Sequence, residues 1–275
     1  MKYTAMLLAL LMAVGAANAT QIVLKERVSA TDLLREGMTQ VTIDDLTMSF
    51  SGDPVSGLTA RDTTGNSTWA LVVGLEGYWQ EGLVGLKDLT DYIPVSSDLI
   101  DSVTFRIRQR SPTYVGEEFG VYRVTTPWMT YFGAGVAETV VTADTIIHGA
   151  EPWKWGDGTA GFSSDDYTTV DGGAFTITTT TGNTAYDVDI TNIAKGWVDD
   201  PSTNNGLLVY MTNWYDGAPW DGDTPYFHPS EDGLIGPTDA RIYSGMEFII
   251  QYVPEPATMA LLAIGGIGAL LRRRR

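Results

Sequence analysis

The strongest constraint on the fold is a two-residue alternation of apolar and polar side chains in the middle of the chain. Successive side chains of a β-strand point to opposite faces, so alternation indicates half-buried strands and short apolar runs indicate more deeply buried ones. Alternation is found at residues 103–109, 174–180 and 185–190, and apolar runs at 69–73, 206–211 and 246–252. Residues 20–253 are therefore predicted to be all-β.

Clusters of Gly, Asn, Asp and Pro separate these segments and are typical of turns. The clearest are Asp53-Pro54, Thr64-Gly65-Asn66, Asp171-Gly172-Gly173 and Asp200-Pro201. Many short strands divided by turns predict a jelly-roll-like antiparallel β-sandwich. One short helix is expected at residues 191–198, where Ile193 and Trp197 share a face at i, i+4. Because neither an internal repeat nor a linker interrupts residues 20–253, we predict one domain there.

Residues 1–19 have the pattern of a secretory signal peptide. Lys2 supplies a positive charge, residues 5–17 are mostly apolar, and Ala17-Asn18-Ala19 is a small-x-small cleavage site. The alternative is a buried N-terminal helix. We favour export through the Sec machinery with cleavage after Ala19. The chain has no Cys, which excludes a disulfide scaffold, a thiol enzyme and a Cys-ligated zinc site.

The body is strongly acidic, which limits its partners. The whole chain has 17 Lys and Arg, 34 Asp and Glu, and a formal charge of −17. Lys2, Arg272 to Arg275 and Glu255 lie in the terminal segments, so residues 20–253 keep 12 basic and 33 acidic residues, a charge of −21. Such a surface repels phosphate backbones and anionic bilayers, so no nucleic-acid partner is expected. Cations and neutral ligands remain open.

The last 22 residues, 254–275, have three parts: Pro254-Glu255-Pro256, an apolar stretch at 259–271, and Arg272 to Arg275. As a helix the 13-residue stretch would be about 20 Å long, which is shorter than a hydrocarbon core of roughly 30 Å. Snorkelling arginines could still hold it in a membrane with the basic end in the cytoplasm. The two prolines keep the tripeptide extended, as recognition by a processing enzyme requires.

This order of elements closely resembles the PEP-CTERM sorting signal. The resemblance implies that the tail is recognised and removed by an exosortase, an enzyme usually found alongside exopolysaccharide synthesis. It also implies transient membrane insertion through the C-terminal helix and delivery to the cell envelope or extracellular matrix. The resemblance indicates a destination, and it does not indicate an activity.

Residues 71–252 resemble DNRLRE-type domains. The stretches that carry this resemblance are Gly82 to Leu89, Ile93-Pro94, Ile100 to Ile107, Val121 to Thr125 with Trp128, Tyr186 to Ile190 through Trp197 to Asn205-Gly206-Leu207-Leu208, and Phe227-His228-Pro229-Ser230-Glu231. The resemblance implies a β-sandwich of secreted or surface proteins. Some members of that family are carbohydrate-binding modules, including alginate binders. Residues 153–171 and 214–226 are longer here than the family pattern leads us to expect.

Aromatic residues fall into two groups. Trp128 and Trp197 lie among alternating apolar residues and are predicted to pack in the core. The second group lies in stretches rich in Gly, Asp and Pro, where exposed rings could stack on the faces of sugars. We name as candidate carbohydrate-binding residues Trp153, Trp155, Trp214, Tyr215, Trp220 and Tyr226. The alternative is that these rings fold back over an edge of the sandwich.

Arg106, Arg108 and Arg110 alternate with apolar residues, so their guanidinium groups are predicted to project from one face of a strand. They could hold the carboxylates of an acidic polysaccharide bidentately. The alternative, which we favour, is pairing with Asp or Glu on a neighbouring strand.

Acidic residues cluster at Asp165-Asp166, at Asp199-Asp200, and at Asp221 and Asp223 near Asp232. Oxygen-rich loops of this kind suit a structural Ca²⁺, and Asp221, Asp223 and Asp232 are the candidate ligands. The window from Asp221 to Asp232 is not an EF-hand, because Tyr226 occupies its sixth position and Asp232 its twelfth.

Signals for catalysis are weak. The two histidines, His148 and His228, fit neither a zinc-binding nor a triad pattern, and no glycine loop has a phosphate-binding fingerprint. We therefore expect an exported, non-catalytic module that is structural or binds acidic or neutral exopolysaccharide. The alternatives are a secreted polysaccharide-active enzyme, a glycoside hydrolase or lyase, and a purely structural matrix protein.

Overall fold

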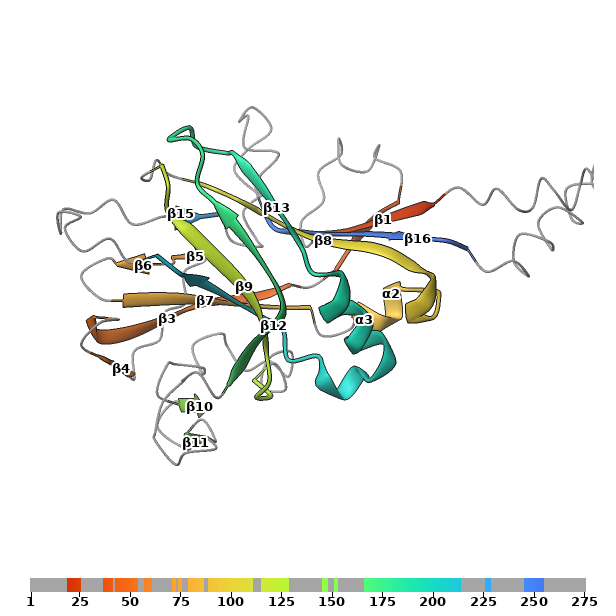
Figure 1. Cartoon of the computed structure of the whole chain (residues 1–275). Helices are drawn as coiled ribbons and strands as arrows, with labels where there is room; N and C mark the ends of the chain where they lie inside the picture. Colours follow the sequence, from red (N-terminus) through yellow and green to blue (C-terminus); the bar gives the residue numbers. More distant parts are fainter. Residues whose placement is uncertain are drawn as a thin grey trace, which may run out of the picture.

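The computed structural model describes residues 19–25, 37–41, 43–53, 57–60, 71–72, 74–75, 79–86, 89–110, 115–128, 145–147, 151–152, 166–213, 226–228 and 245–254. Within these ranges the strands form a five-stranded sheet, a seven-stranded sheet and two small two-stranded sheets (Figure 1). The helices in the same ranges are few and short. The predicted all-β class is therefore confirmed for the described part of the chain.

The five-stranded sheet brings together the two ends of the body. Its order is β13 (Ala185–Asp189), β8 (Ile100–Arg108), β16 (Glu247–Tyr252), β1 (Thr20–Lys25) and β2 (Met38–Gln40). The alternation at residues 103–109 is confirmed in β8, where Val103, Phe105 and Ile107 are buried. Residues 185–190, 206–211 and 246–252 are likewise strands, β13, β14 and β16, within one residue of the predicted bounds.

One pairing differs from the predicted antiparallel sandwich, because β1 and β2 pair in parallel. The antiparallel partner of β1 is β16, with Thr20 opposite Tyr252. Twelve residues, 26–37, separate β1 from β2. Parallel neighbours need a long connection of about this length, because the chain must return to the same end of the sheet before it pairs.

The seven-stranded sheet is antiparallel throughout. Its order is β12 (Tyr167–Thr176), β9 (Glu118–Val124), β14 (Leu207–Met211), β7 (Trp79–Gly85), β3 (Asp44–Asp53) and β4 (Gly57–Ala60), with β6 (Gly74–Leu75) also on β7. The two small sheets pair β10 (Thr145–Ile147) with β11 (Glu151–Pro152), and β5 (Leu71–Val72) with β15 (Tyr226–Phe227).

Both large sheets face a common aromatic core. Phe119 of β9 stacks on Phe175 of β12 with ring centroids 5.0 Å apart. Phe175 stacks in turn on Tyr186 of β13, at 5.1 Å, which joins the seven-stranded sheet to the five-stranded one. Phe227 of β15 meets Phe119 edge to face at 5.4 Å. Such tilted and offset contacts add to the stabilisation from burial.

Short helices lie at one end of the sheets. The predicted helix at 191–198 is α3 (Thr191–Asp199), with Ile193 and Trp197 buried on its inner face. In the described ranges the structure adds a single-turn helix, α2 (Leu89–Tyr92), and two 3₁₀ turns, η2 (Ser97–Leu99) and η5 (Pro201–Thr203). In the described part of the chain, none of the helices has the length and apolar character needed to cross a bilayer. The apolar stretch at 259–271 lies outside that part.

The Asp171-Gly172-Gly173 cluster is not the predicted turn between strands. It lies inside β12, where the pairing with β9 shifts register between Thr168 and Gly173 and Asp171 has a φ of 63°. A Cβ on Gly172 would come within 2.6 Å of the Tyr122 ring. One on Gly173 would come within 2.3 Å of the Val188 side chain. Gly and Asp therefore serve here as β-bulge residues, which allow close approach on both faces of the sheet.

Trp128 and the turn before β14 hold three strands together. The fully buried indole of Trp128 donates a hydrogen bond from Nε1 to the Asn205 carbonyl oxygen, at 2.5 Å. The Asn205 side chain donates to the Thr125 carbonyl after β9, and that of Asn204 donates to the Leu86 carbonyl after β7. Gly206 has a φ of +78°, and a Cβ there would lie 2.5 Å from the Val84 carbonyl oxygen. The predicted core role of Trp128 is confirmed.

Candidate functional site

Most of the aromatic and acidic residues predicted to bind sugar or calcium lie outside the described part of the chain. This holds for Trp153, Trp155, Trp214, Tyr215, Trp220, Asp221, Asp223 and Asp232, whose roles stay predictions. Tyr226 lies in β15, of which the backbone is described. Glu255 and Pro256 also lie outside the described part, which ends at Pro254.

The described members of the other acidic clusters have local structural partners. The carboxylate of Asp166 is buried and accepts a hydrogen bond from the Thr126 hydroxyl at 2.5 Å. Asp199 accepts one from the Ser97 hydroxyl at 2.5 Å. Asp200 accepts one from the Ser202 backbone N–H at the start of η5. In the ranges that the structure describes, no three His, Asp or Glu side chains are arranged to hold a metal ion.

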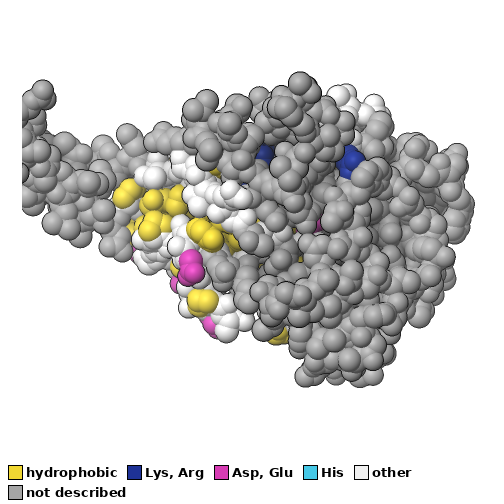
Figure 2. Space-filling view, turned by 180° about the vertical axis from the view of Figure 1, so that it is seen from behind, with side chains coloured by type: hydrophobic (Ala, Val, Ile, Leu, Met, Phe, Trp, Pro, Cys, Tyr) yellow, Lys and Arg dark blue, Asp and Glu magenta, His cyan; other side chains and the backbone are white. Residues whose placement is uncertain are grey.

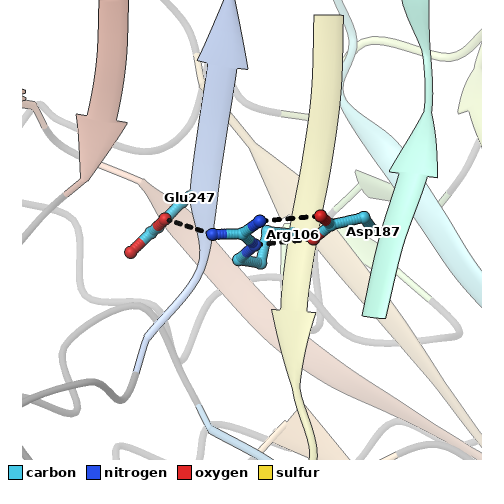
Figure 3. Close-up of polar contacts among 3 residues, drawn as sticks. All are labelled: Arg106, Asp187 and Glu247. Carbon is cyan, nitrogen blue, oxygen red and sulfur yellow. Dashed lines mark hydrogen bonds and ion pairs between the residues drawn. The ribbon is translucent and has the colours of Figure 1, made fainter. Parts of the chain in front are cut away.

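Arg106 is the centre of an ion-pair row across the outer face of the five-stranded sheet (Figure 3). Its Nε and Nη2 donate to the two carboxylate oxygens of Asp187 on β13, at 2.6 and 2.7 Å. Its Nη1 lies 3.5 Å from Oε2 of Glu247 on β16, a side chain that is only 1% exposed. The register directly pairs Arg106 with both residues. The favoured prediction of cross-strand pairing thus describes Arg106.

The same register extends the row to further strands. Leu24 of β1 is opposite Phe248, so the next pair places Lys25 opposite Glu247. Lys25 is 1% exposed, and Gln40 of β2 is its neighbour on the other side. Charges therefore alternate in sign across β13, β8, β16 and β1. Opposite charges directly across from each other stabilise strand pairing.

The other two predicted arginines are placed differently. Arg108 is the last residue of β8, and its charge adds to the lowering of the Asp187 pKa. Arg110 follows the end of the strand and is partly exposed. No described feature tests whether any of the three binds an acidic sugar, so that role stays a prediction.

The Arg106 pair should make the stability of the protein depend on pH. The hydrogen bonds from Arg106 lower the pKa of the Asp187 carboxyl group in the folded state, although its partial burial opposes this. A lowered folded-state pKa stabilises the fold above the unfolded-state pKa of about 3.9. That stabilisation is lost as the pH falls through the folded value.

We therefore expect Asp187→Asn to lower the free energy of unfolding by about 0.5–1 kcal/mol at pH 7, because the carboxylate is 48% exposed and screened by solvent. Urea unfolding of the two proteins from pH 7 to pH 2 should show this difference shrinking below pH 4. Asp101→Asn, on an exposed position of the neighbouring strand β8, is the matched control. An equal loss in both variants would show that the Arg106 pair contributes nothing specific.

Three tyrosines on the seven-stranded sheet form a cluster that the sequence analysis did not identify. Tyr122 of β9 and Tyr167 of β12 have nearly parallel rings, with centroids 5.8 Å apart and planes at 9°. Tyr167 and Tyr210 of β14 are 6.4 Å apart at 28°. All three rings are partly exposed. We call these three residues the tyrosine cluster.

Strand register places the tyrosine cluster on the outer face of the sheet. Tyr210 is paired with Gly120, and Tyr167 with Val124. Phe119 and Val121 of β9 point into the core, so Gly120 and Tyr122 lie on the opposite face of the sheet, with Tyr210 beside Gly120. Tyr167 stacks on Tyr122 and therefore shares that face. A Cβ on Gly120 would come within 2.2 Å of the Tyr122 ring, which therefore lies directly over this glycine.

The phenols of the tyrosine cluster are held in the neutral form. Burial raises the pKa of Tyr122. Burial raises the pKa of Tyr167 and Tyr210 too, and the negative charge of the nearby Glu81 on β7 raises both further. Glu81 itself is 4% exposed. Neutral phenols donate and accept hydrogen bonds, but they are not bases at physiological pH.

The C-terminal end of the body lies beside its N-terminal end. β1 and β16 run side by side in Figure 1, and Thr20, the first residue after the predicted cleavage site, is opposite Tyr252. The Val253 N–H donates to the Leu99 carbonyl, so backbone pairing continues to one residue before Pro254. Seen from behind, the described surface in this region carries hydrophobic and acidic side chains next to one another (Figure 2).

Comparison with known families identifies this C-terminal end. Residues 253–275 match the PEP-CTERM protein-sorting motif, which confirms the resemblance seen in Pro254-Glu255-Pro256, the apolar stretch and the terminal arginines. The motif implies an exported protein whose membrane-associated tail is processed by an exosortase. No curated protein matches the chain. The motif covers the tail alone, so the role of the body has to be argued from its own residues.

Proposed function

We propose that this protein is exported, is processed by an exosortase, and then serves in the cell envelope or extracellular matrix as a non-catalytic structural or carbohydrate-binding module. The observation that carries this proposal is the position of the sorting motif. It begins at Val253, directly after β16, the strand that pairs with the first strand of the body. The motif is therefore an appendage to a folded β-rich body, and its removal would leave all the described strands in place.

The proposal includes a single jelly-roll-like, DNRLRE-like sandwich domain at residues 20–253. Its support is that residues carrying the resemblance occupy structural positions. Trp128 donates a hydrogen bond to Asn205, Gly206 packs against β7, and Phe227 is fully buried between Phe119 and Phe175. Residues at these positions stabilise the fold, so any ligand would be bound by other residues.

A non-catalytic role is favoured over a polysaccharide-active enzyme by the state of the described titratable groups. The tyrosine phenols have raised pKa values, so they are protonated at physiological pH. Arg106 is engaged by two carboxylates. The ring Nε2 of the buried His228 is 2.7 Å from the Asn183 amide oxygen. Release of reducing ends or of unsaturated sugars from matrix polysaccharides would instead establish the glycoside hydrolase or lyase.

Processing can be tested by replacing both prolines of the motif, Pro254→Ala and Pro256→Ala, in a host that has an exosortase. We expect the full-length precursor to accumulate in the membrane fraction, because the tripeptide loses its fixed extended backbone. At least a tenfold lower ratio of processed to unprocessed protein should be seen by immunoblotting with antibodies to the body and by intact-mass measurement. A tenfold change corresponds to a loss of about 1.4 kcal/mol in the free energy with which the enzyme recognises the motif.

The matched control carries Pro94→Ala and Pro201→Ala, both at exposed positions of the described body. This variant should be processed like the unaltered protein. Normal processing of the motif variant, or the recovery of mature protein that still carries Arg272 to Arg275, would contradict exosortase sorting.

A further inference from the structure

We propose that the tyrosine cluster is a binding site for uncharged sugar rings. The inference rests on the proposed function, and it narrows the ligand of a carbohydrate-binding module from polysaccharides in general to neutral ones. It also places that ligand on the outer face of the seven-stranded sheet, over β9, β12 and β14. These strands carry Tyr122, Tyr167 and Tyr210.

The partly exposed rings supply aromatic surface of the kind on which sugars stack. Tyr122 and Tyr167 are parallel to within 9°. The Tyr122 ring rests over Gly120 and beside Gly172, where a Cβ on either glycine would collide with it. The sheet is thus shaped to accept this ring close against the backbone. Partly exposed rings fixed by their neighbours bind with little loss of side-chain entropy.

The hydroxyl groups of the same three tyrosines add polar atoms to this surface. Each phenol keeps its proton, because burial raises the pKa of all three and the Glu81 charge raises the pKa of Tyr167 and Tyr210 further. A neutral hydroxyl can donate one hydrogen bond and accept others, which matches the hydroxyl groups at the edge of a sugar ring. Aromatic faces combined with a few directional polar groups are the common composition of a small-ligand site.

Charge selects the class of sugar. Residues 20–253 carry a net charge of −21, and one of these carboxylates, that of the buried Glu81, raises the pKa of Tyr167 and Tyr210 by its charge. A uronate or a sulfated sugar would be repelled by both. Arg106, on the other large sheet, is engaged by Asp187 and Glu247. The chemistry of the tyrosine cluster therefore fits a neutral polysaccharide better than an acidic one.

The competing explanation is that the tyrosines only stabilise the sheet. Aromatic pairs across neighbouring strands do contribute to strand pairing. The two explanations predict different effects of a substitution in the tyrosine cluster. If the tyrosines only pack, the substitution lowers the stability of the protein and leaves sugar affinity unchanged. If they bind sugar, it lowers the affinity even when the protein stays folded. The experiment has to record both quantities.

The test is affinity electrophoresis of the processed protein purified from its host, in native gels that contain hydroxyethyl cellulose as the neutral probe or alginate as the acidic one. We expect the neutral gel to retard the protein and the alginate gel not to retard it. Tyr122→Ala should weaken the apparent affinity for the neutral probe at least about tenfold, as loss of a central aromatic contact does. Tyr92→Ala, at a partly exposed tyrosine in α2, is the matched control and should bind as before.

Two further variants keep the test decisive if Tyr122→Ala unfolds, which circular dichroism and thermal unfolding would reveal. Gly120→Ala keeps all three rings but pushes Tyr122 off the sheet, and should weaken binding. Tyr122→Phe keeps the ring and should retain most of the affinity.

The outcomes separate this inference from the proposed function. Binding that is unchanged in folded Tyr122→Ala or Gly120→Ala overturns the tyrosine cluster as the site, while leaving a carbohydrate-binding module in place. Stronger retardation by alginate than by the neutral probe overturns the ligand class. Binding to neither probe overturns the inference, while normal exosortase processing would leave the structural alternative of the proposed function in place.

Discussion

Replacement of Trp128 by alanine is expected to destabilise the protein by about 3–5 kcal/mol, the range for deleting a fully buried aromatic side chain. The indole is 0% exposed, so its loss removes buried area and leaves a cavity between the ends of β7, β9 and β14. The variant also leaves the Asn205 carbonyl, itself in a buried contact, without its indole donor. Loss of a buried hydrogen-bond partner costs about 1–3 kcal/mol. Urea unfolding at pH 7 measures the change directly.

Trp128→Phe is the matched variant, because it keeps most of the ring volume and removes the donor. It should lose about 1–3 kcal/mol, the hydrogen-bond share of the effect. A loss below about 1 kcal/mol in Trp128→Ala would show that the three strand ends are held by other contacts.

The second large effect is expected at Arg106. Arg106→Met removes the cation that lies between Asp187 and the nearly fully buried Glu247. Breaking a buried ion pair by removing one partner typically costs 3–5 kcal/mol. We expect about 2–4 kcal/mol here, because the arginine side chain is 24% exposed and solvent screens part of the interaction.

A double-mutant cycle isolates the pair. Glu247→Gln removes the buried charge that Arg106→Met leaves behind, so the double variant should be more stable than the sum of the two single losses predicts, by about 1 kcal/mol or more. Lys195→Met, in α3, controls for the loss of a positive charge elsewhere. Additive losses in the cycle would show that Arg106 and Glu247 do not interact energetically.

Local sequence patterns predict the individual strands well. The alternation of residues 103–109 predicts β8 and its buried side chains, because the period of a half-buried strand is visible within a few residues. Trp128 and Trp197 are predicted to be buried for a similar reason, as large rings in apolar surroundings. The Asp171-Gly172-Gly173 cluster is interpreted wrongly as a turn, since the residues that favour turns also favour a β-bulge. The register shift against β9 and the close packing of Tyr122 and Val188 distinguish the bulge from the turn.

Strand order and the tyrosine cluster could not be predicted in the same way. Tyr122, Tyr167 and Tyr210 belong to three strands, and they meet only because the register of β9 with β12 and β14 puts them on one face. A single sequence carries no direct signal for register between distant strands. The pairing of Arg106 with Asp187 could be predicted only in part. The alternation predicts the face of the strand from which Arg106 projects, and pairing with Asp or Glu on a neighbouring strand is the favoured prediction. Which acidic residue it pairs with depends on the strand order and register of the fold.

The adjacency of β1 and β16 has a consequence for the order of events during biosynthesis. During secretion β1 is the first strand to reach the far side of the membrane. It cannot join the five-stranded sheet until β16, the last strand, has also crossed, because β16 lies between β8 and β1. Closing a loop of more than 220 residues is slow, and contacts at such separation delay folding. The five-stranded sheet can therefore be completed only after nearly the whole polypeptide has been translocated, so the tail anchor would hold a newly exported chain at the membrane during the interval in which it is still unfinished.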